Sequence, residues 1–274
     1  MLNQLEFISE KQIQKLNHLR NYLKKLKSAC IAYSGGVDST LVATIAYEQL
    51  GGRALAITGI SPALATQLLT EARSQAKWIG IKHYEINTSE LQDKDYTTNP
   101  KDRCFACKRE LHKHTTYLSK KLNYKNVLDG VNFDDLDDFR PGIKASQDAG
   151  VLSPLAFFKF SKKDIREISR SLGLPWWDKP AQPCLSSRFP YGYEITYSRL
   201  KMIEKAEAYI RQCGIDDVRV RCQGTSARIE IPSDKIQYFI QSYKREELVN
   251  FFFEIGFKST CLDLEGLVSG KLNR

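Results

Sequence analysis

Residues 34–39 read SGGVDS and directly follow the apolar run ACIAY at residues 29–33. Consecutive glycines allow backbone conformations that a Cβ would forbid, and they let N–H groups approach a phosphate closely. The next segment, 40–50, is apolar at helical spacing, so the turn leads into a helix whose N-terminus attracts anions. Strand, glycine turn and helix together predict a nucleotide-binding turn.

Amides and hydroxyls of this turn are predicted to bind the nucleotide: Ser34, Gly35, Gly36 and Ser39. Asp38 is expected to serve a magnesium ion or a helix cap, because a carboxylate beside phosphates needs such a partner. The turn lacks the lysine of the GxxxxGK(S/T) pattern, which excludes a Walker-type loop. An ordinary glycine turn is the alternative, but the full hexapeptide resembles the SGGxDS signature of the PP-loop ATP pyrophosphatases. That family splits ATP between the α- and β-phosphates and transfers AMP to an acceptor.

The chain has 274 residues, of which 42% are hydrophobic and 27% charged, enough for one large domain and a small one. No segment reaches the ~18 consecutive apolar residues of a membrane helix, and the first residues lack the apolar core of a signal peptide. We therefore expect a cytoplasmic protein without a membrane partner. The chain has seven cysteines, and disulfides are unusual in that compartment. The cysteines are therefore expected to have a chemical role.

The net charge of +9 indicates anionic partners. RNA and small nucleotides satisfy this charge equally well, but no basic strand with stacking aromatics is present, so nucleic acid is not the expected partner. We expect a small-molecule nucleotide substrate and a homo-oligomeric protein.

Apolar β-type runs alternate with helical patterns along the first part of the chain. Strands are expected at 29–33, 54–58, 83–86 and 126–129, and helices at 40–50, at 63–79 and from the Ser161–Asp164 capping box to Gly173. This alternation predicts an α/β fold with a parallel sheet. With the resemblance above, residues 1–183 are expected to form a Rossmann-like PP-loop domain of the adenine nucleotide alpha hydrolase-like kind.

A proline cluster at 175–190 reads as linker and active-site loop. Beyond it a helix at 198–212, strands at 218–222 and 227–231, a helix ending near 253 and a strand at 260–264 are expected. Residues 184–274 are thus predicted to form a smaller α+β domain for substrate binding or oligomerisation.

Ligands of a parallel sheet gather beyond the carboxyl ends of its strands. Ser61 follows the second strand and is expected to contact the adenine or ribose, although Ser61-Pro62 is also a good turn. The fourth strand leads into a loop with Asp129-Gly130, Asn132 and four further aspartates. One of these carboxylates is a candidate magnesium ligand, while most of such a loop is expected to face solvent.

Residues 103–108, RCFACK, form a CxxC that we place in a loop. Flanking cations stabilise a thiolate and suit metal binding or nucleophilic chemistry. A tetrahedral zinc site would need further ligands, and His112 or His114 is the only candidate among the histidines. A pair of unligated cysteines is the alternative, and the remaining cysteines outside this pair and Cys184 are interpreted as small hydrophobes.

Several motifs in order narrow the resemblance: SGGVDS, RCFACK, LDGVNFDDLDDFRPG, CLSSRFPYG, VRVR and ARIEI. Together they are similar to the LarE family, ATP-dependent sulfur transferases of nickel-pincer nucleotide biosynthesis, over nearly the whole chain. The resemblance implies that a carboxyl group of a pyridinium biscarboxylate mononucleotide is adenylated and then converted to a thiocarboxylate. Cys184 matches the key cysteine of the family, and a thiolate attacking an activated carboxyl is ordinary nucleophilic catalysis.

The resemblance also implies two kinds of LarE protein. In one, a lone cysteine gives up its own sulfur; in the other, three cysteines hold an iron-sulfur cluster. This chain has Cys104, Cys107 and Cys184, which favours a 4Fe-4S cluster with one iron open to an extra sulfide. Cys184 as sacrificial sulfur donor is the alternative.

Four further residues are expected to bind substrate. Arg188 is placed to lower the Cys184 thiol pKa or hold a phosphate, with a plain surface arginine as the alternative. Arg219 and Arg221 alternate on one strand, and Glu230 lies in the facing segment; solvated charges on a half-exposed strand are the alternative there.

Two other functions stay open at this level. A tRNA sulfurtransferase also combines a PP-loop with cysteines, but would need an RNA-binding module. A nucleotide sensor holding zinc would contain zinc and no acid-labile sulfide, so metal analysis separates it from the enzyme.

Overall fold

The computed structural model describes residues 6–138, 140–242, 244–268 and 271. These residues divide into two compact units. The first comprises Met1–Tyr96 with Asp102–Gln182, and the second comprises Thr97–Lys101 with Pro183–Arg274. The sequence did not suggest that the short segment Thr97–Lys101 belongs with the second unit. Hydrogen bonds join it to that unit: Gly192 N donates to Asn99 O, Ile195 N donates to Thr97 O, and Asn99 Nδ2 donates to Pro190 O.

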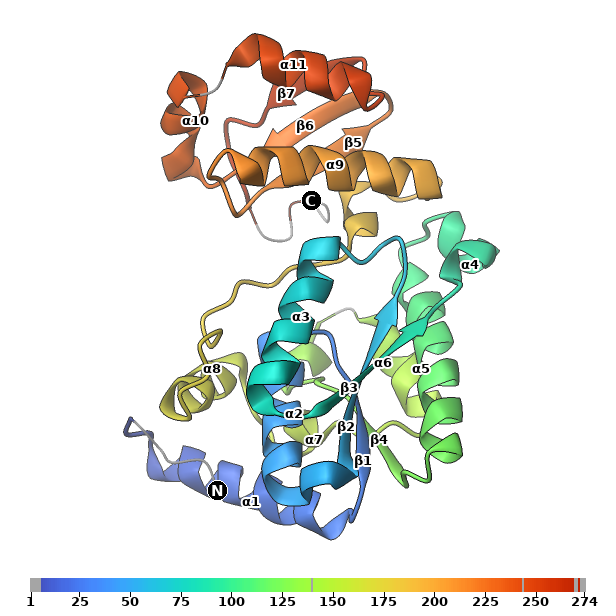
Figure 1. Ribbon diagram of the computed structural model, residues 1–274, viewed down its shortest axis with the longest axis vertical. Helices are drawn as coiled ribbons and strands as arrows, with labels where there is room; N and C mark the ends of the chain where they lie inside the picture. Colours follow the sequence, from blue (N-terminus) through green and yellow to red (C-terminus); the bar gives the residue numbers. More distant parts are fainter. Residues whose placement is uncertain (1–5, 139, 243, 269–270, 272–274) are drawn as a thin grey trace. The chain divides into compact units, whose positions relative to one another are not determined.

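The first unit is a parallel sheet with helices on both faces (Figure 1). Its strands are β1 (Ala29–Ala32), β2 (Ala54–Ile60), β3 (Lys82–Asn87) and β4 (Asn126–Leu128). Its helices are α1 (Glu10–Lys25), α2 (Val37–Leu50), α3 (Thr66–Ile79), α5 (Arg103–Lys121), α6 (Pro141–Asp148), α7 (Pro154–Phe157) and α8 (Lys162–Ser171), and α4 (Lys94–Thr97) ends at the unit boundary.

The strand order is β3-β2-β1-β4, with every neighbouring pair parallel. Ala29 pairs with Ala54 on one side and with Asn126 on the other, so β1 is an inner strand. Strands that are buried on both faces have continuous apolar sequences. Strand β1 has such a sequence, ACIA, and all four of its residues are buried. The expected Rossmann-like α/β architecture is thereby confirmed.

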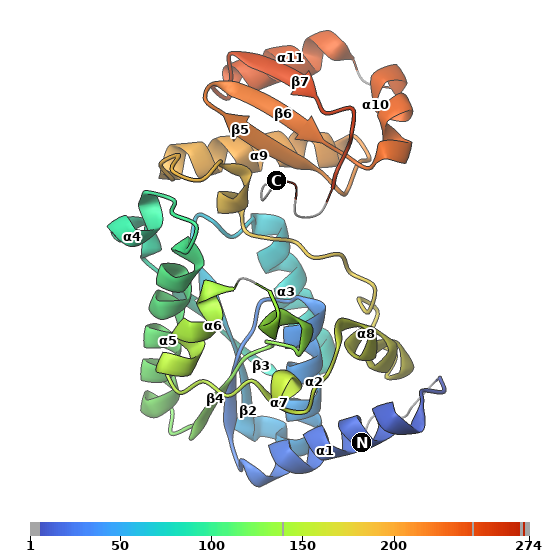
Figure 2. The same ribbon diagram turned by 180° about the vertical axis from the view of Figure 1, so that it is seen from behind.

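Successive residues of β1 pack into two separate hydrophobic clusters, because the side chains of a strand alternate between the two faces of the sheet. Ile31 belongs to a large cluster with residues of α1, α2, α3 and α8, whereas Cys30 packs with Leu55 and Val127 on the side of α5. Figures 1 and 2 show the same division, with α3 and α8 on one side of the sheet and α5 and α6 on the other. The burial of Cys30 and Cys222 agrees with their interpretation as small hydrophobes, whereas Cys213 and Cys261 are exposed, so that interpretation is wrong for them.

Several helices differ from the sequence expectation, among them α1 and α3. Helix α1 was not predicted, although Ser9 and Gln12 form a capping box and Leu16, Leu19 and Leu23 make its buried stripe. Helix α3 begins at Thr66 rather than 63, because Ser61 opens a turn in which its Oγ accepts from Ala63 N. The predicted capping box of α8 is confirmed: Ser161 Oγ accepts from Asp164 N, and the Asp164 side chain accepts from Ser161 N.

The second unit is a three-stranded mixed sheet with helices (Figure 1). It contains β5 (Arg219–Gln223), β6 (Ser226–Glu230), β7 (Ser259–Leu262), α9 (Tyr197–Gln212), α10 (Ile236–Ser242) and α11 (Arg245–Glu254). Strands β5 and β6 are antiparallel, while β6 and β7 are parallel. Among the described residues of both units, no helix combines the length and the apolar character needed to cross a membrane.

Candidate functional site

The turn 34–39 has the geometry of an anion-binding helix start. Gly35 has φ +71°, a left-handed conformation that favours glycine, and Gly36 is the N-cap of α2. The first amides of a helix have no acceptor within it, so they remain available for a ligand. Ser34 is exposed, and its Oγ lies 3.1 Å from the Oγ of the buried Ser39. The turn therefore offers backbone and hydroxyl donors together at the carboxyl end of β1.

Close backbone packing holds this turn in place. A Cβ on Gly35 would lie 3.0 Å from the Cβ of Ala72 in α3. A Cβ on Gly130, beyond β4, would lie 2.7 Å from Ser39 N, closer than real Cβ atoms come to any heavy atom. Glycine at 130 thus lets the β4 loop touch the first turn of α2, a role that its sequence context did not reveal.

Asp38, in the first turn of α2, lies near the carboxylate of Asp135, which belongs to the loop after β4. Burial, followed by the negative charge of Asp135, raises the pKa of Asp38 to about 6, although Lys162, a hydrogen bond with Asn132 and Arg140 each lower it. Asp135 is only 4% exposed, and its Oδ1 lies 3.1 Å from Arg140 Nη2 and 3.4 Å from Lys162 Nζ. The half-buried Asp38 and the buried Asp135 beside the glycine turn are a suitable donor set for a divalent cation.

The acidic loop is partly buried, although most of its aspartates face solvent as expected. Asp129, Asn132 and Asp135 are buried, whereas Asp134, Asp137 and Asp138 are exposed. Asp129 Oδ1 accepts from Val131 N, but its buried Oδ2 has no hydrogen-bond partner in the described part of the chain. A buried carboxylate oxygen without a partner is costly unless a cation or water takes it.

Ser61 lies directly after β2, at the same end of the sheet as the turn. It is half-buried, and its Oγ and carbonyl oxygen stabilise the turn to α3 by accepting from Ala63 N and Leu64 N.

The CxxC is helical, so its predicted placement in a loop is wrong. Cys104 and Cys107 lie in the first two turns of α5, three residues apart and therefore on one face of the helix. The apolar periodicity that would have revealed α5 is weak, because its buried stripe contains His112, Thr115 and Ser119. His112 bonds Ser146 Oγ of α6 through Nε2 at 2.8 Å, and burial lowers its pKa to about 3. A helix start stabilises a thiolate, which suits the CxxC chemistry.

Cys184 belongs to the second unit and precedes the 3-10 turn Leu185–Arg188. Its side chain is half-buried, and its carbonyl oxygen accepts from Ser187 N at 3.0 Å. Arg188 is 5% exposed, which excludes the alternative of a surface arginine. Arg188 Nη1 donates to the carbonyl oxygens of Pro183 and Cys184, at 2.9 and 3.4 Å, so it fixes the backbone that carries the cysteine.

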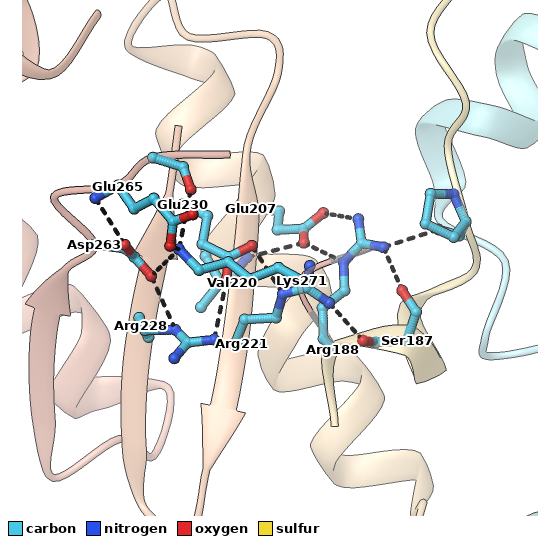
Figure 3. A network of polar contacts seen from close by, with 12 residues as sticks. Ser187, Arg188, Glu207, Val220, Arg221, Arg228, Glu230, Asp263, Glu265 and Lys271 are labelled. Carbon is cyan, nitrogen blue, oxygen red and sulfur yellow. Dashed lines mark hydrogen bonds and ion pairs between the residues drawn. The ribbon is translucent and has the colours of Figure 1, made fainter. Parts of the chain in front are cut away.

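Figure 3 shows the polar network behind this backbone. Glu207 of α9, fully buried, accepts from Arg188 at both oxygens, at 2.7 and 3.1 Å, and also from Arg211 and Val220 N. The bidentate geometry expected for a phosphate on Arg188 is thus formed with a carboxylate of the chain itself.

Arg221 and Glu230 form the second ion pair of the network. Arg221 Nε lies 2.9 Å from Glu230 Oε2, and its Nη1 donates to Ser187 O at 2.7 Å. The other oxygen of Glu230 accepts from Arg228 Nη2 at 3.1 Å. Arg219 shares the strand face of Arg221, and burial, followed by the charges of Arg188 and Arg221, lowers its pKa. Arg188 and Arg221 are themselves paired with the buried carboxylates of Glu207 and Glu230.

The Arg188–Glu207 pair gives a stability prediction. Glu207→Ala should lower the free energy of unfolding by about 3–5 kcal/mol, because it leaves a buried guanidinium without its carboxylate. Denaturant titration of the full chain measures this. Glu247→Ala is the control, since its pair with Lys244 is exposed on both sides and should contribute no more than about 1 kcal/mol. Equal losses for the two variants would contradict the structural role.

All seven cysteines lie among the described residues, and none of them forms a disulfide there. Within those same residues, no three or more His, Cys, Asp or Glu side chains gather closely enough to hold a metal ion. Cys104 and Cys107 therefore provide two thiols on one helix face, and a third would have to come from elsewhere.

Known proteins resemble this chain over most of its length, although no protein-family model matches it. An uncharacterized protein of Synechocystis sp. is 54% identical, over 95% of this chain and 97% of its own. The pyridinium-3,5-bisthiocarboxylic acid mononucleotide synthase of Lactiplantibacillus plantarum is 34% identical, over 92% of this chain and 91% of its own. One subunit of the glutamine-hydrolyzing GMP synthase of Archaeoglobus fulgidus is 22% identical, over 72% of this chain and 68% of its own.

Proposed function

We infer the function from the family: the chain belongs to the LarE sulfur transferases, which include the pyridinium-3,5-bisthiocarboxylic acid mononucleotide synthase of L. plantarum. It is an ATP-dependent sulfur transferase that adenylates a carboxylate of a pyridinium biscarboxylate mononucleotide, releases pyrophosphate and forms a thiocarboxylate. The observation that carries this proposal is the glycine turn 34–39 at the start of α2, in a chain that matches a named thiocarboxylate synthase over nine-tenths of its length.

ATP is proposed to bind at this turn, and Ser61 is proposed to contact its adenine or ribose. Backbone amides and the hydroxyls of Ser34 and Ser39 would hold phosphate oxygens, and the dipole of α2 favours their charge. Transfer of AMP turns a carboxylate oxygen into a good leaving group. The carboxylate attacks the α-phosphorus, the bond to the β-phosphate oxygen breaks, and pyrophosphate leaves.

Magnesium is proposed at Asp38 and Asp135. The raised pKa of Asp38, to which the charge of Asp135 contributes, fits a cation beside these carboxylates, and so does the buried Asp129 oxygen that has no hydrogen-bond partner among the described residues. When bound, the ion would neutralise phosphate charge during pyrophosphate release.

The sulfur is proposed to come from a 4Fe-4S cluster on Cys104, Cys107 and Cys184, or from Cys184 itself. The two thiols on one face of α5 support the first source and would ligate the cluster, which would supply an exchangeable sulfide when bound. The half-buried Cys184, with its backbone fixed by Arg188, supports the second.

The second unit is proposed to bind the substrate phosphate near Arg219, with Arg188, Arg221 and Glu230 holding the surrounding structure. We also propose that residues 1–183 and 184–274 are the two domains of the protein. The protein is further proposed to be homo-oligomeric and cytoplasmic.

A product assay tests the reaction. We expect AMP, pyrophosphate and a thiocarboxylate when the full chain is incubated with Mg·ATP and pyridinium-3,5-biscarboxylic acid mononucleotide. Chromatography and mass spectrometry identify these products. Release of ADP and orthophosphate instead would show that the PP-loop chemistry is absent. Iron and acid-labile sulfide in anaerobically prepared protein would support the cluster, and zinc alone would favour a sensor.

A further inference from the structure

Lys179 lies in segment 174–182 of the first unit, after α8, and its ammonium reaches the phosphate turn. Nζ donates to Gly35 O at 3.3 Å and lies 2.5 Å from Glu71 Oε2 of α3. The Lys179 side chain is only 13% exposed, so its charge is held at the turn rather than in solvent. Nothing in the local sequence suggests this, since Lys179 and Gly35 are 144 positions apart.

The backbone around Lys179 is anchored on two helices. Arg166 of α8 donates to Asp178 O at 3.3 Å and to Lys179 O at 3.2 Å. The ring of Trp176 packs edge-on against Trp78 of α3, with 5.2 Å between centroids. The ammonium is thus presented by a fixed segment rather than by a loosely attached surface loop.

Helix α3, the turn and Lys179 meet at one place. Ala72, whose Cβ limits any side chain at Gly35, directly follows Glu71 in the sequence of α3. The ion pair of Lys179 and Glu71 therefore stands beside the glycine backbone that would cradle a phosphate.

We propose that Lys179 binds the triphosphate of ATP and supplies the cation that the sequence 34–39 itself lacks. This rests on the proposed function, because it requires ATP at the turn. A charged phosphate oxygen is a stronger acceptor for an ammonium than the neutral carbonyl of Gly35. Lysine has three donors on a flexible stem, so Nζ exchanges Gly35 O for a phosphate oxygen, and this phosphate competes with Glu71 for the ammonium.

Chain continuity gives the contact a second consequence. Lys179 precedes Cys184 by five residues. A bond from Lys179 to the triphosphate therefore restrains the chain that leads to the cysteine, and amides of segment 174–182 should exchange hydrogen more slowly when ATP is bound.

Calorimetric titration of the full chain with Mg·ATP tests the proposal without requiring sulfur transfer. Lys179→Met should raise the Kd for ATP about 10- to 100-fold, and Lys179→Arg should restore most of the affinity. Glu71→Gln should lower the Kd, because it removes a carboxylate that competes with phosphate for the ammonium. Lys163→Met is the control: this lysine of α8 is 81% exposed and its loss should leave the Kd unchanged.

The Glu71 variant separates phosphate binding from a structural ion pair. If Lys179→Met and Glu71→Gln weaken ATP binding equally, Lys179 only holds α3, and the proposal is overturned. Normal ATP binding by Lys179→Met also overturns it, while the proposed function stands. Failure of the unmodified chain to bind Mg·ATP would overturn both. Lys179→Gln replaces the methionine variant should that one lose its helical circular dichroism.

Discussion

Replacing Cys184 by serine is expected to abolish thiocarboxylate formation while AMP transfer continues. Serine keeps the size of the side chain and the bonds that Ser187 and Arg188 make to the residue 184 carbonyl oxygen, so the local backbone should persist. What is lost is the sulfur, which both proposed sources require. Pyrophosphate release should stay near the unmodified rate, and the thiocarboxylate should fall below detection.

Cys213→Ser is the matched control for this variant. Cys213 is an exposed cysteine of the same unit, located at the C-terminal cap of α9. It should retain full sulfur transfer. Sulfur transfer by Cys184→Ser would remove Cys184 from both mechanisms.

Mass spectrometry after turnover then distinguishes the two sulfur sources. If Cys184 is sacrificed, its Sγ forms a bond to the activated carboxyl carbon as AMP leaves. Loss of the α-proton and cleavage of the Cβ–S bond leave dehydroalanine and the thiocarboxylate. The protein then loses the mass of hydrogen sulfide, one product forms per chain, and Cys104→Ser and Cys107→Ser stay active. An unchanged mass with several products per chain, and inactive Cys104 and Cys107 variants, would indicate the cluster.

Asp38→Asn is expected to lower pyrophosphate release at least about 100-fold, because a magnesium ion's stabilisation of transition-state charge is worth several kcal/mol. Asparagine keeps the shape of the side chain but removes the charge that a magnesium ion needs. A steady-state pyrophosphate assay at saturating ATP measures the loss. Asp137→Asn, an exposed carboxylate of the β4 loop, is the control and should react normally.

The stability of this variant should not fall. The folded-state pKa of Asp38, about 6, lies above its ordinary value of 3.8, so folding disfavours its charged form. Asp38 therefore contributes less to stability as pH rises from about 4 to 6, and at pH 7 the neutral asparagine should be at least as stable. An Asp38→Asn protein with a lower thermal midpoint at pH 7, or with normal pyrophosphate release, would contradict this account.

Much of the fold was predictable because its signals are local. The strand at 29–33, the turn and the helix that follows are consecutive, and the capping box of α8 lies within four residues. Helix α5 was missed for an equally local reason: its buried stripe is polar and bonds to Ser146 and to backbone carbonyl oxygens, so the chain shows little apolar periodicity there.

The sequence by itself determined the phosphate turn, the alternation that builds a parallel sheet, and the order of motifs that marks a sulfur transferase. Only the tertiary structure decided that Asp135 faces Asp38, that Gly130 touches Ser39, that Arg188 donates to Glu207, and that Lys179 reaches Gly35. The physical reason is that propensity, capping and periodicity act over a few residues. Which distant side chains share a buried charge is fixed instead by strand order and by the close packing of backbones.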